Sequence, residues 1–282
     1  MIPRGSTIAL ATATLLVAFS DGMLISLSAQ AVSSEVQKKR STARTVPGPA
    51  AADHPPVQHP PAPTEEWTAA DVIAGLEECD LLLRPLGAGY DTSKPIRHGQ
   101  CGLPVPILLR RVAGVEITPP TIVNCRVAAK LHAWIESSLQ PTAQKLLGQP
   151  ISRIVSASGY SCRQRIGTTS GKQSEHSYAN AFDIAAFILQ DGRTIGVLTA
   201  WGPTARDLRA QAQLSAGTLA GGDPRPLSDG AGTTEQDKTF LQKAHASACG
   251  VFTTVLGPEA NEAHRNHLHM DLAQRRGAAL CE

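Results

Sequence analysis

The sequence predicts an α+β domain in which a small antiparallel sheet is flanked by helices and stabilised by disulfides. Apolar residues recur at helical spacing over residues 72–83 and 127–139, which predicts two amphipathic helices. Residues 151–158 and 182–188 have the composition and alternation of β-strands. Helices packed against strands that are joined by hairpins define the α+β class. Six cysteines accompany these elements.

The first 31 residues predict an export signal. Arg4 precedes an apolar run over residues 8–19, and Ala29-Gln30-Ala31 has the small residues of a cleavage site. The alternative is an uncleaved membrane anchor, because residues 8–27 are nearly long enough to span a bilayer. Asp21 disfavours a stable span. We therefore expect cleavage after Ala31 and a periplasmic or secreted protein, or in the alternative case a protein tethered to the inner membrane.

A linker is predicted over residues 32–66, which are rich in proline and alanine. Such a segment buries too little apolar surface to fold, and its prolines favour an extended chain. The folded domain is expected to occupy residues 67–282. The formal net charge of the chain is +2, which is too small to indicate a nucleic-acid partner.

The cysteines indicate an oxidising compartment. No two of them have the C-x-x-C spacing of a zinc knuckle or a redox motif. An even number in an exported chain predicts three disulfides, for which fifteen pairings are possible. The cysteines are Cys79, Cys101, Cys125, Cys162, Cys249 and Cys281.

The elements of the first half are a helix, a loop-rich region and a second helix. Thr68 and Asp71 resemble a capping box at the start of the first helix. Residues 84–121 contain many glycines and prolines and are expected to form short strands and loops. Asn124 is predicted to cap the second helix, and Pro141 to interrupt or end it. Both helices are interpreted as scaffold.

The second half is predicted to supply most of the sheet. After the strand at residues 151–158, a polar loop (167–175) leads to the strand at 182–188. Asp191-Gly192 predicts a hairpin turn, and residues 194–198 the returning strand. Residues 215–233 are interpreted as a surface loop and residues 239–248 as a helix. Two further strands are expected at 251–256 and 267–272.

Two stretches carry the candidate site. In the first, His176 stands seven residues before Asp183; in the second, His267 and His269 occupy alternate positions of a predicted strand. Side chains at i and i+2 of a strand project from the same face, so both imidazoles point one way. Two imidazoles and one carboxylate, with an open fourth position, form the ligand set of a catalytic zinc site. We assign His176, Asp183 and His269 as Zn²⁺ ligands.

Other residues are expected to complete a hydrolytic site. His267 is placed to accept a proton from zinc-bound water and later to return it. His264 either orients His267 or contacts the substrate. Arg163 is expected to bind a substrate carboxylate or polarise the scissile carbonyl, since its planar fork suits either group. Asp271 is either an outer partner of a ligand histidine or a carboxylate at the end of a strand.

The motifs resemble those of a known superfamily. Ser-x-His-x6-Asp followed by His-x-His is similar to the metallopeptidases that unite lysostaphin, D-Ala-D-Ala metallopeptidases and the sonic hedgehog signalling domain. The triple His264-x2-His267-x-His269 resembles the penicillin-insensitive murein endopeptidases. The chain over about residues 76–282, with all six cysteines, closely resembles the bacterial extensin-like C-terminal domain family. The runs that carry this resemblance are 158–163, 174–176, 179–184, 248–252 and 256–261.

This resemblance implies a hedgehog-like or DD-peptidase-like fold, the metal ligands above and a cell-wall setting. D-Ala-D-Ala carboxypeptidases have a glutamate three residues before the last zinc histidine, where this chain has Asn266. His267 is therefore expected to take over that role. The first hypothesis is a zinc-dependent peptidoglycan hydrolase acting on stem peptides or cross-links. The alternatives are a non-catalytic wall-binding or structural protein, and an envelope factor whose membrane tether matters more than its site.

Overall fold

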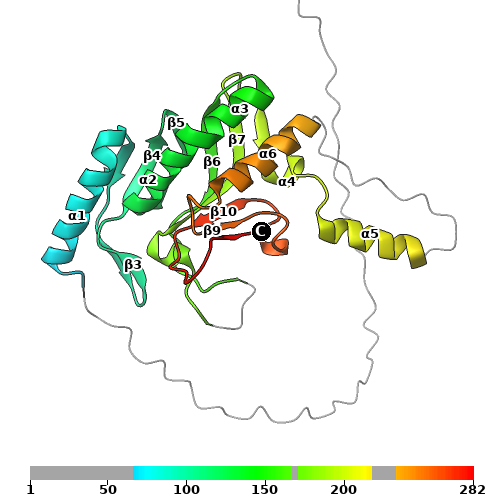
Figure 1. The fold of residues 1–282 in the computed structure, drawn as a ribbon. Helices are drawn as coiled ribbons and strands as arrows, with labels where there is room; N and C mark the ends of the chain where they lie inside the picture. The colour runs from blue at the N-terminus through cyan, green and yellow to red at the C-terminus, as the bar shows by residue number, and fades with distance from the viewer. Residues whose placement is uncertain (1–65, 167–170, 218–232) are drawn as a thin grey trace, which may run out of the picture. The chain divides into compact units, whose positions relative to one another are not determined.

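A computed structural model describes residues 66–166, 171–217 and 233–282, all of which belong to one compact unit (Figure 1). The predicted signal or anchor and all of the predicted linker except Glu66 lie outside the described residues. Most of the loop predicted at residues 215–233 lies outside them as well. Within the described ranges, no helix combines the length and the apolar character needed to cross a bilayer.

The sheet is larger than expected and is mixed rather than antiparallel. It has nine strands in the order β1-β4-β5-β6-β7-β10-β9-β11, with β8 paired to β7. The pairs β5–β6 and β9–β11 are parallel, and the other pairs are antiparallel. The strands are β1 (Gly89–Thr92), β4 (Ile107–Val112), β5 (Val115–Val123), β6 (Ile151–Ser158), β7 (Ala181–Leu189), β8 (Thr194–Gly196), β9 (Thr254–Leu256), β10 (Leu268–Asp271) and β11 (Leu280–Cys281). A separate hairpin pairs β2 (Ile96–His98) with β3 (Cys101–Leu103).

Helices flank this sheet, which confirms the α+β class. They are α1 (Ala69–Leu83), α2 (Cys125–Trp134), α3 (Gln140–Leu147), α4 (Val197–Ala200), α5 (Ala205–Gly217) and α6 (Glu235–Ala248). Figure 1 shows α2, α3 and α6 in front of the sheet. Phe187 of β7 contacts Trp134 of α2 and Phe240 of α6, with ring centroids 6.4 and 5.3 Å apart. This layer buries the apolar core.

The regular α-helix is interrupted directly before Pro141 but does not end there, which is the first of the two predicted outcomes. A π-helical turn, η2 (Ile135–Leu139), joins α2 to α3, and Pro141 lies in the first turn of α3. Proline lacks the backbone N–H that would continue the helical hydrogen bonds, and the π-turn lies directly before it. The continuous helical segment is what crosses between the parallel strands β5 and β6, and parallel neighbours require such a crossover.

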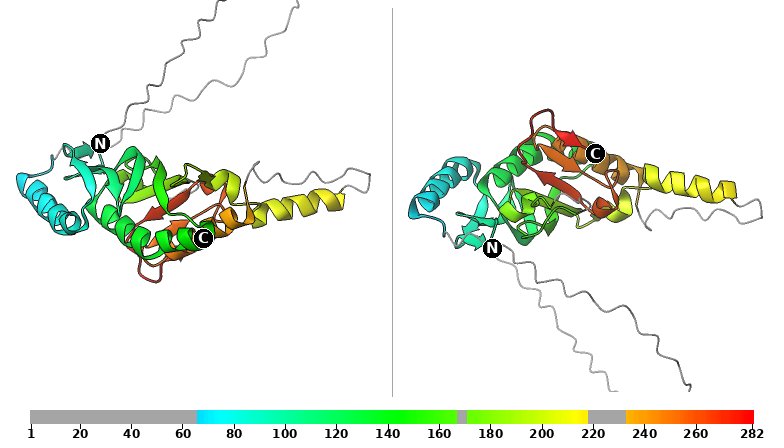
Figure 2. Two further views of the ribbon diagram at one scale, coloured as in Figure 1. Left: turned by 90° about the horizontal axis from the view of Figure 1, so that it is seen from above. Right: turned by 90° about the horizontal axis from the view of Figure 1, so that it is seen from below.

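Three further elements differ from the sequence prediction. Helix α5 was not predicted, and Figure 2 shows it near the end of the sheet opposite to α1. Helix α4 begins at Val197, so the returning strand β8 is shorter than predicted. The alternation in β7 shifts by one residue, because Phe182, Ile184, Phe187 and Leu189 all belong to the core. The pairing of β7 with β6 shifts register in the same stretch.

All six cysteines form disulfides, as predicted. Cys79 of α1 is bonded to Cys125 of α2, Cys101 to Cys162, and Cys249 to Cys281. The first bridge joins the two scaffold helices, and the second joins the β2–β3 hairpin to the loop after β6. Three disulfides fit an extracytoplasmic protein, because such bonds persist in oxidising compartments.

Candidate metal centre

Three predicted ligands converge on the sheet face turned away from the neighbouring core residues. His176 lies in η3 (Glu175–Tyr178), Asp183 in β7 and His269 in β10. Nε2 of His176 lies 3.1 Å from Nδ1 of His269 and 3.1 Å from Oδ2 of Asp183, and Nδ1 of His269 lies 2.8 Å from Oδ1 of Asp183. Their exposed fractions are 0%, 3% and 8%. Among the described residues, this is the group whose ligand atoms are close enough to share one metal ion.

Strand alternation explains why two of the ligands meet. Asp183 and His269 are directly opposite each other in the antiparallel pair β7–β10. Their neighbours Phe182, Ile184 and Leu268 project to the other face and are fully buried in the core. A one-residue slip would exchange the two faces, so burial of the apolar set holds the ligands in register.

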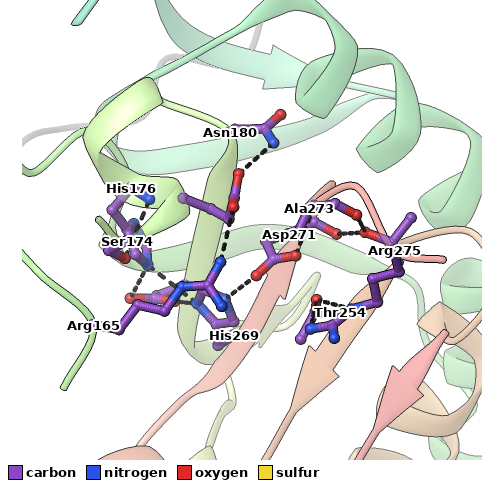
Figure 3. Close-up of polar contacts among 12 residues, drawn as sticks. Arg165, Ser174, His176, Asn180, Thr254, His269, Asp271, Ala273 and Arg275 are labelled. Atoms are coloured by element: carbon purple, nitrogen blue, oxygen red, sulfur yellow. Dashed lines mark hydrogen bonds and ion pairs between the residues drawn. The ribbon is translucent and has the colours of Figure 1, made fainter. Parts of the chain in front are cut away.

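Local capping places His176 beside this pair. The Ser174 side chain caps η3 and accepts a hydrogen bond from the His176 N–H. Ala179 then takes a left-handed conformation (φ 50°), which ends η3 and leads the chain into β7. Asn180 donates a hydrogen bond to Glu175, which also accepts one from Arg165 (Figure 3). These contacts brace the turn that carries the ligand.

The ring nitrogen of His176 that points away from the other two predicted ligands, which we call its outer nitrogen, is bonded to a backbone carbonyl. Nδ1 lies 2.6 Å from the carbonyl oxygen of Gly159, so Nδ1–H is the donor and Nε2 is left to bind a metal. Gly159 is required for this approach, because a Cβ at that position would lie 2.3 Å from the Ile122 carbonyl oxygen and 2.3 Å from Thr121. A larger residue there would displace the carbonyl that orients His176.

The outer nitrogen of His269 is held by a carboxylate. Nε2 lies 2.9 Å from Oδ2 of Asp271, and Oδ1 of the same carboxylate accepts a hydrogen bond from the Ala273 N–H (Figure 3). Thr254, opposite Asp271 on β9, helps to lower the pKa of that carboxyl, and its hydroxyl accepts two hydrogen bonds from Arg275. Asp271 thus bonds one ring nitrogen of the predicted ligand His269 and is more than a carboxylate at the end of a strand. It leaves Nδ1 of His269 directed at the other ligands.

The electrostatics favour a bound cation. Burial would raise the pKa of Asp183, but hydrogen bonds from His176 and His269 hold it well below its usual range. Burial alone would lower the pKa of His269, whereas its bonds to Asp183 and Asp271 raise it to about 9. Burial also acts to raise the pKa of Asp271, and the His269 hydrogen bond lowers it overall. The buried carboxylates of Asp183 and Asp271 are therefore ionised and favour a positive charge between them and the histidines.

The donor set fits zinc. Bonds of about 2.0–2.2 Å place neighbouring ligand atoms of a tetrahedral zinc site roughly 3.3 Å apart. The three separations observed here, 2.8 to 3.1 Å, are close to that value. Both imidazoles donate their outer N–H to an oxygen, as histidines that ligate metals usually do. These residues can therefore hold Zn²⁺ with small adjustments of their side chains.

The two additional histidines adjoin this centre. Nε2 of His267 lies 3.8 Å from Oδ2 of Asp183, and its Nδ1 lies 2.8 Å from the side-chain oxygen of Asn266. The ring of His264 lies 5.2 Å from that of His267 and 5.7 Å from that of His269. Burial is the largest reason why the pKa of His264 falls to about 4 and that of His267 falls below its usual value. Both rings are therefore neutral at pH 7.

Arg163 lies on the loop that follows β6. Its backbone is bonded to the Ser177 side chain through both N–H and carbonyl, which ties the loop to η3. The positive charge of Arg163 contributes to the lowered pKa of His264 and of His267. Within the described ranges, no carboxylate forms an ion pair with its guanidinium. The structure thus brings all six predicted site residues into one region.

Sequence reasoning gave no role to several residues that build the site. One ring nitrogen of each of three site histidines is bonded to such a residue: His176 to Gly159, His264 to Asn261, and His267 to Asn266. Thr254 lies opposite Asp271 and is hydrogen-bonded by Arg275. An asparagine directly before or three residues before a histidine was an available signal for two of them. The contacts from Gly159 and Thr254 join residues far apart in the sequence and leave no local pattern.

The chain belongs to the family described as "Extensin-like protein C-terminus". Residues 77–219 and 212–282 match that family, which confirms the resemblance and covers most of the chain. No curated protein and no solved structure matches the chain.

Proposed function

We propose that the protein is a zinc-dependent peptidoglycan hydrolase of the periplasm, which cleaves a peptide bond in stem peptides or cross-links. The convergence of His176, Asp183 and His269, with the remaining ring nitrogen of each histidine bonded to an oxygen, is the observation that carries this proposal. The similarity of its motifs to wall-directed metallopeptidases supports the substrate class. The sequence lacks the repeated Ser-Pro runs of plant extensins, so the family name carries no mechanism.

The similarity of the motifs to those of wall-directed metallopeptidases also supports a proposal about the fold. We propose that the face of β7 and β10 corresponds to the zinc-bearing sheet of the hedgehog and DD-peptidase group. The order of the ligands along the chain, His then Asp then His, supports this correspondence. An experimental structure with zinc bound would test it, and a ligand set other than His176, Asp183 and His269 would contradict it.

The residues of the chain have separate tasks in this mechanism. A zinc ion held by the triad would polarise the scissile carbonyl and lower the pKa of water. His267 is neutral, and its Nε2 faces Asp183, so it can accept the proton of the attacking water and deliver it to the leaving amine. Arg163 would bind a substrate carboxylate or the carbonyl oxygen through its planar guanidinium.

Metal content and muropeptide cleavage test this proposal. We expect about one zinc per oxidatively folded chain and cleavage that chelation abolishes and added zinc restores. His267→Ala should retain zinc and lose cleavage by at least about 100-fold, the size of a general acid–base contribution. Unchanged cleavage in that variant would refute the role of His267. Folded wild type that takes up no zinc would refute the metal centre.

One observation favours a second candidate, a non-catalytic wall-binding protein. Asn266 stands where D-Ala-D-Ala carboxypeptidases have a glutamate, and its side chain is bonded to His267. Co-sedimentation with purified sacculi separates the two functions. Zinc-loaded protein that binds sacculi and releases no fragments would favour the binding function, whereas released fragments would favour the hydrolase.

A further inference from the structure

The side chain of Asn261 has a fixed orientation next to the candidate metal centre. Asn261 caps the short helix η4 (Glu262–His264), and its Oδ1 accepts a hydrogen bond of 3.0 Å from the Ala263 N–H. The same Oδ1 lies 2.8 Å from Nδ1 of His264. A backbone N–H can only donate, so the atom facing both groups is the carboxamide oxygen and not the amide nitrogen.

This orientation determines the tautomer of His264. A carboxamide oxygen only accepts hydrogen bonds, so Nδ1 of His264 carries the hydrogen. In the neutral imidazole the lone pair is then on Nε2, at the other edge of the ring. No described residue forms a hydrogen bond with that Nε2, although the ring is half-buried and lies 5.2 Å from the ring of His267 and 5.7 Å from that of His269.

We propose that Asn261 is a positioning residue that fixes His264 as the Nδ1–H tautomer, so that Nε2 accepts a hydrogen bond from an N–H or O–H group of the substrate. The tautomer follows from the contacts of Asn261 alone. The identity of the donor as a peptide substrate rests on the proposed function. His264 thus binds substrate, which selects one of the two roles expected from the sequence.

The neighbouring pair Asn266–His267 provides a contrast. Oδ1 of Asn266 lies 2.8 Å from Nδ1 of His267, and no other described residue bonds to this carboxamide. Its amide can rotate and present either the oxygen or the nitrogen to the ring. His267 can therefore use both tautomers, as a group that accepts and returns a proton must, whereas His264 is held in one.

Imidazole nitrogen NMR of the full chain, labelled with ¹⁵N-histidine and kept metal-free at pH 8, tests the proposal. The His264→Gln variant assigns the His264 signals. Wild type should show a protonated Nδ1 and an unprotonated Nε2 at His264. Asn261→Ser keeps an acceptor for the Ala263 N–H but is too short to reach the ring, so it should populate the Nε2–H form. Asn261→Asp retains both contacts and should restore the Nδ1–H form.

Asn266→Ser is the matched control, because it removes the equivalent contact from His267 and should leave the His264 signals unchanged. An Nε2–H signature in the wild type would overturn the proposal, as would an unchanged His264 spectrum in Asn261→Ser. In muropeptide cleavage, Asn261→Ser should raise KM by about five- to tenfold, the effect of one lost hydrogen bond, with kcat little changed. Absence of cleavage in the wild type would refute the proposed hydrolase and leave the tautomer result valid.

Discussion

The two parts of the site differ in how they are held. His176, Asp183 and His269 are buried, and the latter two lie on paired strands whose opposite faces fill the core. His264, the last residue of η4, and His267 lie in the connection between β9 and β10, are partly exposed, and are bonded to asparagine side chains. The first arrangement suits a metal ion, which needs ligands in fixed geometry. The second leaves both imidazoles partly exposed, where a substrate can reach them.

The largest expected effect is loss of metal on removing a ligand. His176→Ala and Asp183→Ala should each reduce the zinc content from about one per chain to background, because two ligands do not complete a structural or catalytic zinc site. His98→Ala, on the exposed hairpin strand β2, is the control and should retain zinc. Metal analysis after desalting measures the difference. Equal zinc content in all variants would place the metal elsewhere.

Gly159→Ala should destabilise the protein by about 3 kcal/mol, since the added Cβ overlaps the backbone of Ile122. Chemical denaturation of the oxidised protein measures this free energy. Gly277→Ala is a suitable control, because nothing surrounds the Cβ position there and the backbone is not left-handed. Equal free energies of unfolding for the two variants would mean that the backbone around Gly159 shifts to accommodate the added Cβ. The buried triad would then be less rigidly held than we infer from its packing.

Asp271→Ala should weaken zinc binding by about 10- to 100-fold, as loss of an outer partner of a ligand histidine usually does. Thr254→Val keeps the shape of the side chain but removes the hydroxyl that supports Asp271. It should have the same direction of effect and a smaller size. Competition with a chromophoric chelator measures both affinities. Tighter binding in Asp271→Ala would show that this carboxylate opposes the metal-bound state.

The smallest effect is expected at the ion pair that joins α5 to the connection between β9 and β10. Asp207 forms an ion pair with Arg265, between His264 and His267, and the hydrogen bond from Arg265 lowers the pKa of Asp207 to about 2. A lowered pKa means that the carboxylate stabilises the fold above about pH 4 and loses that contribution as the pH falls through 2. Asp207→Asn should therefore cost about 1 kcal/mol at pH 7 and little at pH 2.

Denaturant titrations of both proteins between pH 2 and 7 measure this difference. A constant difference over the whole range would assign the loss to packing or capping rather than to charge. Thr204 also depends on Asp207, which accepts hydrogen bonds from its N–H and its hydroxyl. The asparagine side chain of the variant retains an acceptor oxygen for those two contacts, so the ion pair is the interaction that the substitution isolates.

Much of the local structure could be predicted from neighbouring residues. Thr68 and Asn124 cap α1 and α2 as expected, and the strand at residues 151–158 was predicted with its observed bounds. The size of the sheet was not predicted, because β1 has only four residues, β5 contains two adjacent prolines, and the apolar run of β4 lies in a region whose many glycines and prolines indicated loops. The continuity of the helix past Pro141 was equally hidden, since a π-turn has no sequence period of its own.

The sequence by itself determined the candidate ligands, because the spacing of His176 and Asp183 and the alternation of His267 and His269 are local properties of the chain. It also determined that the six cysteines would be oxidised. The tertiary structure decided which cysteines pair, that Asp183 faces His269, and which oxygen holds each ring nitrogen. These choices depend on strand register and on contacts between distant residues, which are selected by the packing of the whole core.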